Sequence, residues 1–133
     1  MGMTDPVADL LTRIRNGAKA GKNAVDVPNS NLKKKIVQIM LENKYLKDSI
    51  ELPDNKQGIL RVYLRYSVGD EPVIRGLQRI SRPGLRTYYD AEKVKKSLHN
   101  YRGLMVVSTS RGVMTNFEAA KKGVGGEVLL RCW

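Results

Sequence analysis

The chain has 133 residues, with 24 Lys and Arg against 13 Asp and Glu, and so a formal net charge of +11. This length suits one domain or two small packed halves, and a hydrophobic content of 41% excludes a disordered chain. The charge favours a polyanion, an anionic membrane or an acidic protein as partner, and does not by itself choose among them.

Helical spacing of apolar residues predicts two helices in the first half of the chain. The first follows Thr4, which can cap it, and ends at Gly21. The second follows Ser30 as N-cap and buries a face that begins at Leu32. The lysines at 33–35 lie in its first turns, where they form either a solvated charged face or a phosphate contact.

Short strands complete this half. Residues 24–27 predict one strand, and residues 46–52 and 59–66 predict an antiparallel pair joined by a turn. Apolar and polar residues alternate in the last strand, so one face is buried and the other carries arginines. A break containing Gly and Pro then separates an N-terminal α/β half, residues 1–68, from a C-terminal half, residues 72–133.

The C-terminal half is strongly basic, with no acidic residue from 72 to 89 or from 93 to 117. Strands are predicted over residues 73–80 and 86–89. Tyr88 and Tyr89 are adjacent on the second strand and point to opposite faces. One of them is therefore exposed and can stack on an unpaired base. Alternatively, its ring packs against the protein and only its hydroxyl reaches solvent.

Capping signals predict the remaining elements. Asp90 caps a helix that places Val94, Leu98 and Tyr101 on one face. Thr115 and Glu118 have the spacing of a capping box. The glycines of residues 123–126 lack the Lys-Ser/Thr ending of a P-loop and favour a tight turn into a last strand over residues 127–133.

Residues 103–115 are the most unusual stretch. Four apolar residues, Leu104 to Val107, predict a buried strand that turns abruptly into Ser108, Thr109, Ser110 and Arg111. Three consecutive hydroxyls build a poor core, but they can present donors and acceptors to a polar partner. Within an acid-free basic window, RNA is the partner that we expect.

The sequence supports a catalytic function less well than it supports RNA binding. His99 is the only histidine and has no acid near it in sequence, and Cys132 is the only cysteine. Nucleophilic catalysis and zinc binding both need more partners than these, so we expect no enzyme, no metal and no cofactor. One cysteine allows no intramolecular disulfide, and no apolar run approaches the roughly 20 residues that span a bilayer. We expect a soluble, intracellular protein without a membrane partner.

Three segments together carry a family resemblance. Residues 4–16 read TDPVADLLTRIRN, residues 81–86 read SRPGLR, and residues 108–115, STSRGVMT, precede residues 123–129, GVGGEVL. In this order and spacing they resemble the bacterial-type small ribosomal subunit protein eight family, over essentially the whole chain.

The resemblance implies an α+β fold of two small packed halves. N-terminal helices would lie on a short, mainly antiparallel sheet, and the C-terminal half would be mostly β with short helices. It further implies a structural protein of the cytoplasmic or organellar ribosome that binds a helix in the central domain of small-subunit rRNA directly, early in assembly, beside neighbouring ribosomal proteins. Some family members repress their own mRNA through a mimic of this site, which extends to this chain as a hypothesis.

The resemblance also implies the site. Its leading RNA contacts are the hydroxyls of Ser108, Thr109 and Ser110, and Arg111 adjoins them. Tyr88 and Glu127 match family positions on the same surface. Thr4 and Lys56, in the N-terminal half, are assigned more loosely, as contacts to the RNA backbone. Glu127 either accepts a hydrogen bond from a base amino group or sugar hydroxyl, or orients the serine loop from a neighbouring strand.

The sequence departs from the family pattern at two places. Tyr101-Arg102-Gly103 stands where a glycine-hydrophobic-glycine turn is usual, and Leu130-Arg131-Cys132 replaces the more usual cysteine-aromatic-valine run before Trp133. The first puts the approach to the serine loop in doubt, and neither touches the three hydroxyl residues.

Overall fold

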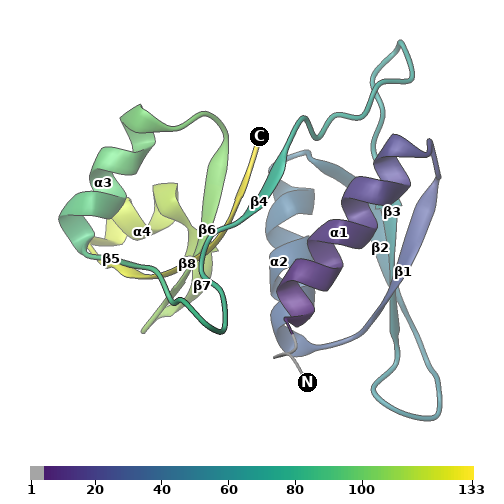
Figure 1. Cartoon of the computed structure of the whole chain (residues 1–133), viewed down its shortest axis with the longest axis horizontal. Helices are drawn as coiled ribbons and strands as arrows, with labels where there is room; N and C mark the ends of the chain where they lie inside the picture. The colour runs from purple at the N-terminus through teal and green to yellow at the C-terminus, as the bar shows by residue number, and fades with distance from the viewer. Residues whose placement is uncertain (1–4) are drawn as a thin grey trace. The chain divides into compact units, whose positions relative to one another are not determined.

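The computed structural model describes residues 5–133, which form four helices and eight strands (Figure 1). Both sheets are antiparallel, and this α+β arrangement confirms the predicted fold class. The chain divides into an N-terminal unit, residues 6–75, and a C-terminal unit, which comprises residues 76–133 together with Asp5. None of the helices in the described part of the chain is both long and apolar enough to cross a membrane.

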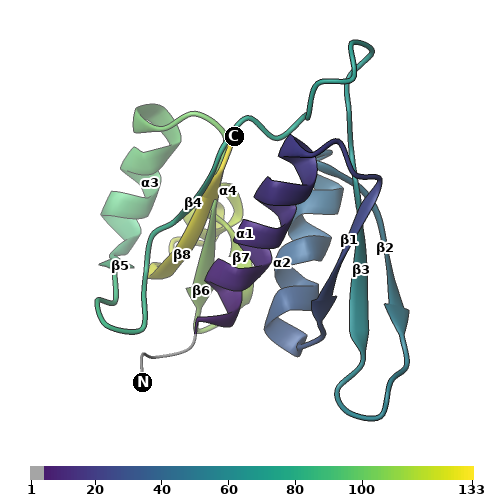
Figure 2. The same cartoon turned by 45° about the vertical axis from the view of Figure 1, so that its right-hand side comes forward.

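The N-terminal unit is a three-stranded sheet with two helices. Its elements are α1 (Pro6–Lys19), β1 (Ala24–Pro28), α2 (Asn31–Glu42), β2 (Leu46–Leu52) and β3 (Ile59–Leu64). The strand order is β1-β3-β2, and both helices lie on one face of the sheet (Figures 1 and 2). The predicted cap of α1, Thr4, lies outside the described residues, whereas Ser30 caps α2 by accepting a hydrogen bond from the backbone N–H of Lys33.

The buried face of α2 differs from the prediction at its first turn. Leu32, expected in the core, is 37% exposed, whereas Lys33 is only 5% exposed. The Lys33 ammonium donates a hydrogen bond to the Pro28 carbonyl at 2.9 Å. This bond gives the charged group a partner while the aliphatic part of the side chain is buried. Lys34 forms an ion pair with Glu51 at 2.8 Å. Both lysines therefore have partners inside the protein.

The C-terminal unit is a five-stranded sheet with two helices. Its elements are β4 (Leu77–Arg79), β5 (Tyr88–Tyr89), α3 (Ala91–Asn100), β6 (Leu104–Thr109), β7 (Gly112–Thr115), α4 (Asn116–Lys122) and β8 (Gly126–Cys132). The strand order is β4-β8-β6-β7, and β5 pairs with β8 as well. The central strand β8 therefore touches β6 on one side and both β4 and β5 on the other.

Two predicted strands are shorter than expected. The strand predicted over residues 73–80 is present only at Leu77–Arg79, and backbone hydrogen bonds from Gly76 to Trp133 and from Ile80 to Leu129 flank it. The strand predicted over residues 86–89 is present only at Tyr88–Tyr89. A tight turn that joins Arg82 and Leu85 through two backbone hydrogen bonds comes before it.

The predicted caps of both C-terminal helices are confirmed. Asp90 accepts from the N–H of Lys93, and Thr115 accepts from the N–H of Glu118. A buried polar network then ties the helices to the sheet: the Asn116 side chain accepts from the backbone N–H of Met105 and donates to the Ser97 hydroxyl.

Glycines let β8 approach its neighbours very closely. A Cβ placed on Gly126 would lie 2.1 Å from the carbonyl oxygen of Ser108, and one on Gly125 would lie 2.3 Å from that of Tyr89. Gly123 ends α4 in the left-handed conformation. The glycine segment therefore turns the chain back into the sheet, as predicted, and it packs backbone against backbone.

We expect Gly126→Ala to lower the free energy of unfolding by about 1–3 kcal/mol, because the added methyl must push β8 away from β6. Gly69→Ala is the matched control, since its methyl would meet nothing within 4 Å and its φ is unstrained. Its effect should stay within about 0.5 kcal/mol. Urea unfolding of the two variants tests this, and equal stabilities would contradict the close-packing account.

Candidate nucleic-acid interface

The serine-threonine stretch lies at the tip of the β6–β7 hairpin. Ser108 pairs with Val113 and Thr109 with Gly112, so the strand continues two residues beyond the apolar run. Ser110 and Arg111 form the turn, and Gly112 follows with a φ of 114°. Pairing with β8 extends to Gly126, which explains why these polar residues remain in the strand.

Thr109 holds the turn together. Its hydroxyl donates to the Gly112 carbonyl at 2.8 Å and accepts from the Arg111 N–H at 3.1 Å. The hydroxyl proton and one lone pair are thus engaged within the hairpin. Among the three predicted contact hydroxyls, that of Thr109 fixes the loop.

Ser108 and Ser110 are different. Within residues 5–133, neither hydroxyl has a hydrogen-bond partner, and Ser110 is exposed whereas Ser108 is half-buried. Arg111 is also exposed and forms no ion pair with another described residue. On a backbone held by Thr109, the hairpin therefore presents two hydroxyls and a guanidinium that have no partner among residues 5–133.

Three of the predicted residues form a row across the sheet. Glu127 of β8 lies opposite Ser108 of β6 on one side and opposite Tyr88 of β5 on the other. Directly opposed residues in antiparallel strands point to the same face. Tyr88 is 67% exposed, while Tyr89 packs against apolar residues on the other face. Tyr88 is therefore the tyrosine available to a ligand.

The Glu127 carboxylate is held by residues that sequence reasoning did not place in the site. It accepts a hydrogen bond from the hydroxyl of Ser81, which is fully buried, and from the Arg86 guanidinium at 2.9 Å. The Ser81 hydroxyl also accepts from the N–H of Thr87. Glu127 therefore anchors the turn of residues 81–87, and its hydrogen bonds do not run to the serine loop. The sequence contains one sign of these partners, because Ser81 and Arg86 are the first and last residues of the SRPGLR segment.

Electrostatics keeps Glu127 ionised. Burial raises the pKa of its carboxyl, but the hydrogen bonds from Ser81 and Arg86 and the charges of Arg86 and Arg79 outweigh burial, so the pKa lies below its usual range. A carboxylate that has already accepted two hydrogen bonds retains lone pairs for a further donor.

The remaining predicted contacts lie apart in the chain. Lys56 is exposed in the turn between β2 and β3, where Asp54 accepts hydrogen bonds from the N–H groups of Lys56 and Gly58. This turn belongs to the N-terminal unit. Thr4 falls outside the described residues.

The groups considered for catalysis are poorly placed for it. The Cys132 side chain is buried, and burial raises the pKa of its thiol to about 12. His99 is exposed on α3. Across residues 5–133, no three His, Cys, Asp or Glu side chains are grouped so that they could hold a metal ion.

Unpaired hydroxyls, an exposed tyrosine and arginines along one side of a sheet are typical of a binding surface for nucleic acid. The family model described as ribosomal protein S8 matches residues 5–133. The chain is 50% identical to small ribosomal subunit protein uS8 of Lactobacillus helveticus and of Lactobacillus acidophilus, and 47% identical to that of Geobacillus kaustophilus, over all 133 residues and the full length of each relative.

The chain belongs to the ribosomal protein S8 family, which confirms the predicted family. It is therefore a structural ribosomal protein and not an enzyme, and its location is the cytoplasmic ribosome.

The Glu127 anchor should make stability depend on pH. A lowered pKa contributes stability above the usual glutamate value of about 4.3, and that stability is lost as pH falls through the lower pKa of the folded state. Wild type should therefore be more stable than Glu127→Gln at pH 7, and the difference should shrink below about pH 4.3. Urea unfolding from pH 7 to pH 3 measures it. A difference that stays constant over this range would show that the charge does not matter.

Proposed function

We propose that the chain binds a helix in the central domain of small-subunit rRNA directly, early in assembly, through the β6–β7 hairpin. The observation that carries this proposal is the pair of hydroxyls on Ser108 and Ser110, which lack partners within the described residues while the backbone beneath them is fixed. The names of the relatives, small ribosomal subunit protein uS8, support the choice of subunit.

The geometry of RNA favours such short side chains. The major groove of A-form RNA is deep and narrow, so proteins read the wide minor groove or a distorted site. A serine hydroxyl can donate to and accept from a 2′-OH or a base edge without ordering a long flexible side chain. Because Ser108 and Ser110 extend from a paired hairpin, little conformational entropy remains to be lost on binding.

Neighbouring residues supply the other parts of recognition. Tyr88, exposed in the same row as Ser108, can stack on an unpaired base. Arg111 at the hairpin tip attracts phosphate, and Glu127, with its remaining lone pairs, can accept from a base amino group. In this proposal the C-terminal half, residues 72–133, carries recognition. The N-terminal half, residues 1–68, adds backbone contacts at Lys56 and Thr4.

The same surface would bind any RNA that reproduces the local shape of the rRNA site. We therefore extend the proposal to the chain's own mRNA, which the protein would repress if that message folds into such a mimic. Competition between a fragment of the mRNA and the rRNA helix for the pure protein tests this extension separately.

Ser110→Ala should weaken binding to the central-domain helix by about 1–3 kcal/mol, because a buried polar group of the RNA loses its partner. Lys95→Ala, which removes an exposed charge on α3, should cost little and mainly reduce the dependence of affinity on salt. Filter binding at several salt concentrations measures both.

An unrelated RNA duplex of equal length serves as competitor. Recognition of the site predicts a large preference for the central-domain helix at the same salt. Equal affinity for the two RNAs would overturn the proposed function. Wild-type affinity in a folded Ser110→Ala variant would overturn only the assignment of the hairpin.

A further inference from the structure

A groove lies on the face of the C-terminal sheet opposite to the one that carries Ser108 and Glu127. It has a volume of about 380 Å³ and is lined by residues of β4, β6 and β8, by the turn of residues 82–85 and by Tyr89 and Tyr101. Its floor includes Met105, which shares a face with Val107 in an apolar cluster. Side chains alternate along β6, so this face is opposite to the one that carries Ser108.

Arg131 lines this groove and has no polar partner among the described residues. It lies on the central strand between Gln78 of β4 and Met105 of β6. Its guanidinium lies 4.3 Å from the ring centroid of Trp133 and 5.0 Å from that of Tyr101. Within residues 5–133 it forms no ion pair or hydrogen bond, and its Nε is buried without a partner.

This arrangement is suited to an oxyanion. Two aromatic rings hold the planar guanidinium in one orientation, so its donors keep a fixed direction. A buried arginine Nε without a hydrogen-bond partner carries a desolvation cost, which a bound oxyanion would offset. The guanidinium fork matches the oxygens of a phosphate or a carboxylate.

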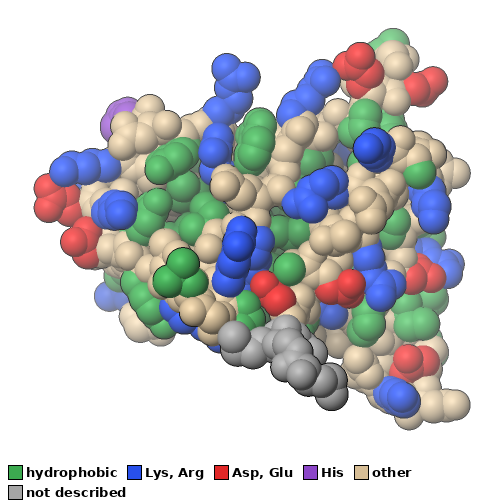
Figure 3. All heavy atoms as spheres, in the orientation of Figure 1, with side chains coloured by type: hydrophobic (Ala, Val, Ile, Leu, Met, Phe, Trp, Pro, Cys, Tyr) green, Lys and Arg blue, Asp and Glu red, His purple; other side chains and the backbone are tan. Residues whose placement is uncertain are grey.

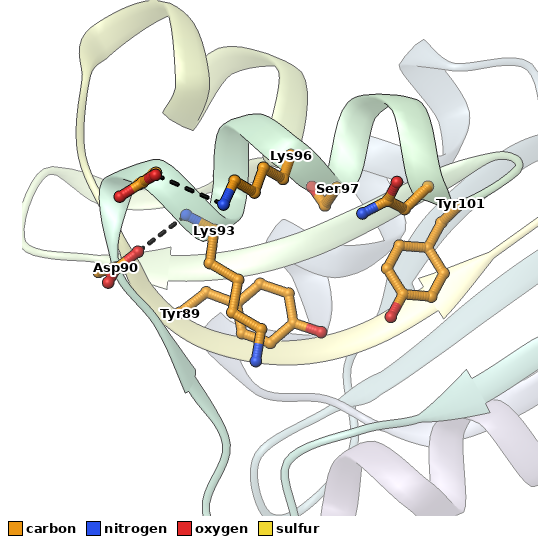
Figure 4. Close-up of a pocket in the computed structure, with 8 residues that line it drawn as sticks. Tyr89, Asp90, Lys93, Lys96, Ser97 and Tyr101 are labelled. Atoms are coloured by element: carbon orange, nitrogen blue, oxygen red, sulfur yellow. Dashed lines mark hydrogen bonds and ion pairs between the residues drawn. The ribbon is translucent and has the colours of Figure 1, made fainter.

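The surroundings favour a chain of phosphates. The exposed Arg82 lines the groove, and an adjoining hollow of about 360 Å³ shares Tyr89 and Tyr101 with it. Figure 4 shows this hollow, where Lys93 extends over the Tyr89 ring at 4.4 Å and the hydroxyls of the two tyrosines point toward each other. Because Arg131, Arg82 and Lys93 are distributed over two adjoining hollows, they match a ligand with several phosphates better than one with a single carboxylate.

The acidic residues of the second hollow are already engaged. Asp90 accepts a hydrogen bond from the N–H of Lys93, and Glu92 forms an ion pair with Lys96 at 3.4 Å. Lys and Arg side chains are prominent on the surface seen in Figure 3. The linings of the groove and the adjoining hollow together contain more Lys and Arg than Asp and Glu, so a polyanion approaching the groove meets net positive charge.

We propose that this groove binds single-stranded RNA, with a backbone phosphate on the Arg131 guanidinium held between Tyr101 and Trp133. This proposal rests on the proposed function for the choice of RNA as ligand, but the groove is a different surface from the β6–β7 hairpin.

Trp133 is the only tryptophan and stacks on Arg131, so its fluorescence reports on the groove. We expect hexauridylate to change the fluorescence of the full chain saturably at fixed salt. Arg131→Lys keeps the charge but loses the planar fork, and should weaken binding about tenfold. Arg131→Gln should weaken it at least as much, whereas Lys95→Gln, which removes the same charge from the exposed surface of α3, should change it less than about twofold.

Arg131→Lys should leave the affinity for the central-domain helix unchanged, and this result distinguishes the groove from the proposed hairpin site. Thermal unfolding of each variant verifies that it is folded. Equal affinities of wild type, Arg131→Lys and Lys95→Gln for hexauridylate would overturn the proposal. So would tighter binding of hexaglutamate than of hexauridylate, because the groove would then take an acidic peptide.

Discussion

The row of Tyr88, Glu127 and Ser108 and the hairpin beside it depend on the close approach of β8 to β6 at Gly126. No side chain fits there, since a Cβ would lie 2.1 Å from the carbonyl oxygen of Ser108. This contact sets the register that places Glu127 opposite Ser108 and also opposite Tyr88. It also extends β6 beyond its apolar residues, so the hydroxyl residues begin on a rigid strand. A polar tip on a tightly paired sheet is well prepared to bind a structured partner.

Hydroxyl side chains serve two purposes in this unit. Those of Ser81 and Thr109 are engaged within the protein, where they hold the 81–87 turn and the hairpin tip. Those of Ser108 and Ser110 have no partner among the described residues. All four residues are serine or threonine, and the surrounding backbone determines whether each hydroxyl finds a hydrogen-bond partner within the protein. The Thr109 hydroxyl thus holds in place the hairpin that carries Ser108 and Ser110.

Local signals in the sequence predicted much of this architecture. Ser30, Asp90 and Thr115 were identified as caps because a cap involves only residues three positions apart. The burial of Lys33 was missed, because it depends on a carbonyl that precedes the helix. The partners of Glu127 were also missed. Ser81 lies 46 residues from Glu127, and no local pattern reports a contact across that separation.

The central claim is that the protein recognises one site in the small-subunit rRNA. A hydroxyl-radical footprint of the full chain on that rRNA tests it most directly. The account predicts protection of one compact region, within a single helix of the central domain, that persists as salt is raised to physiological levels. Scattered protection that fades uniformly with salt would contradict it, because binding would then depend on charge alone.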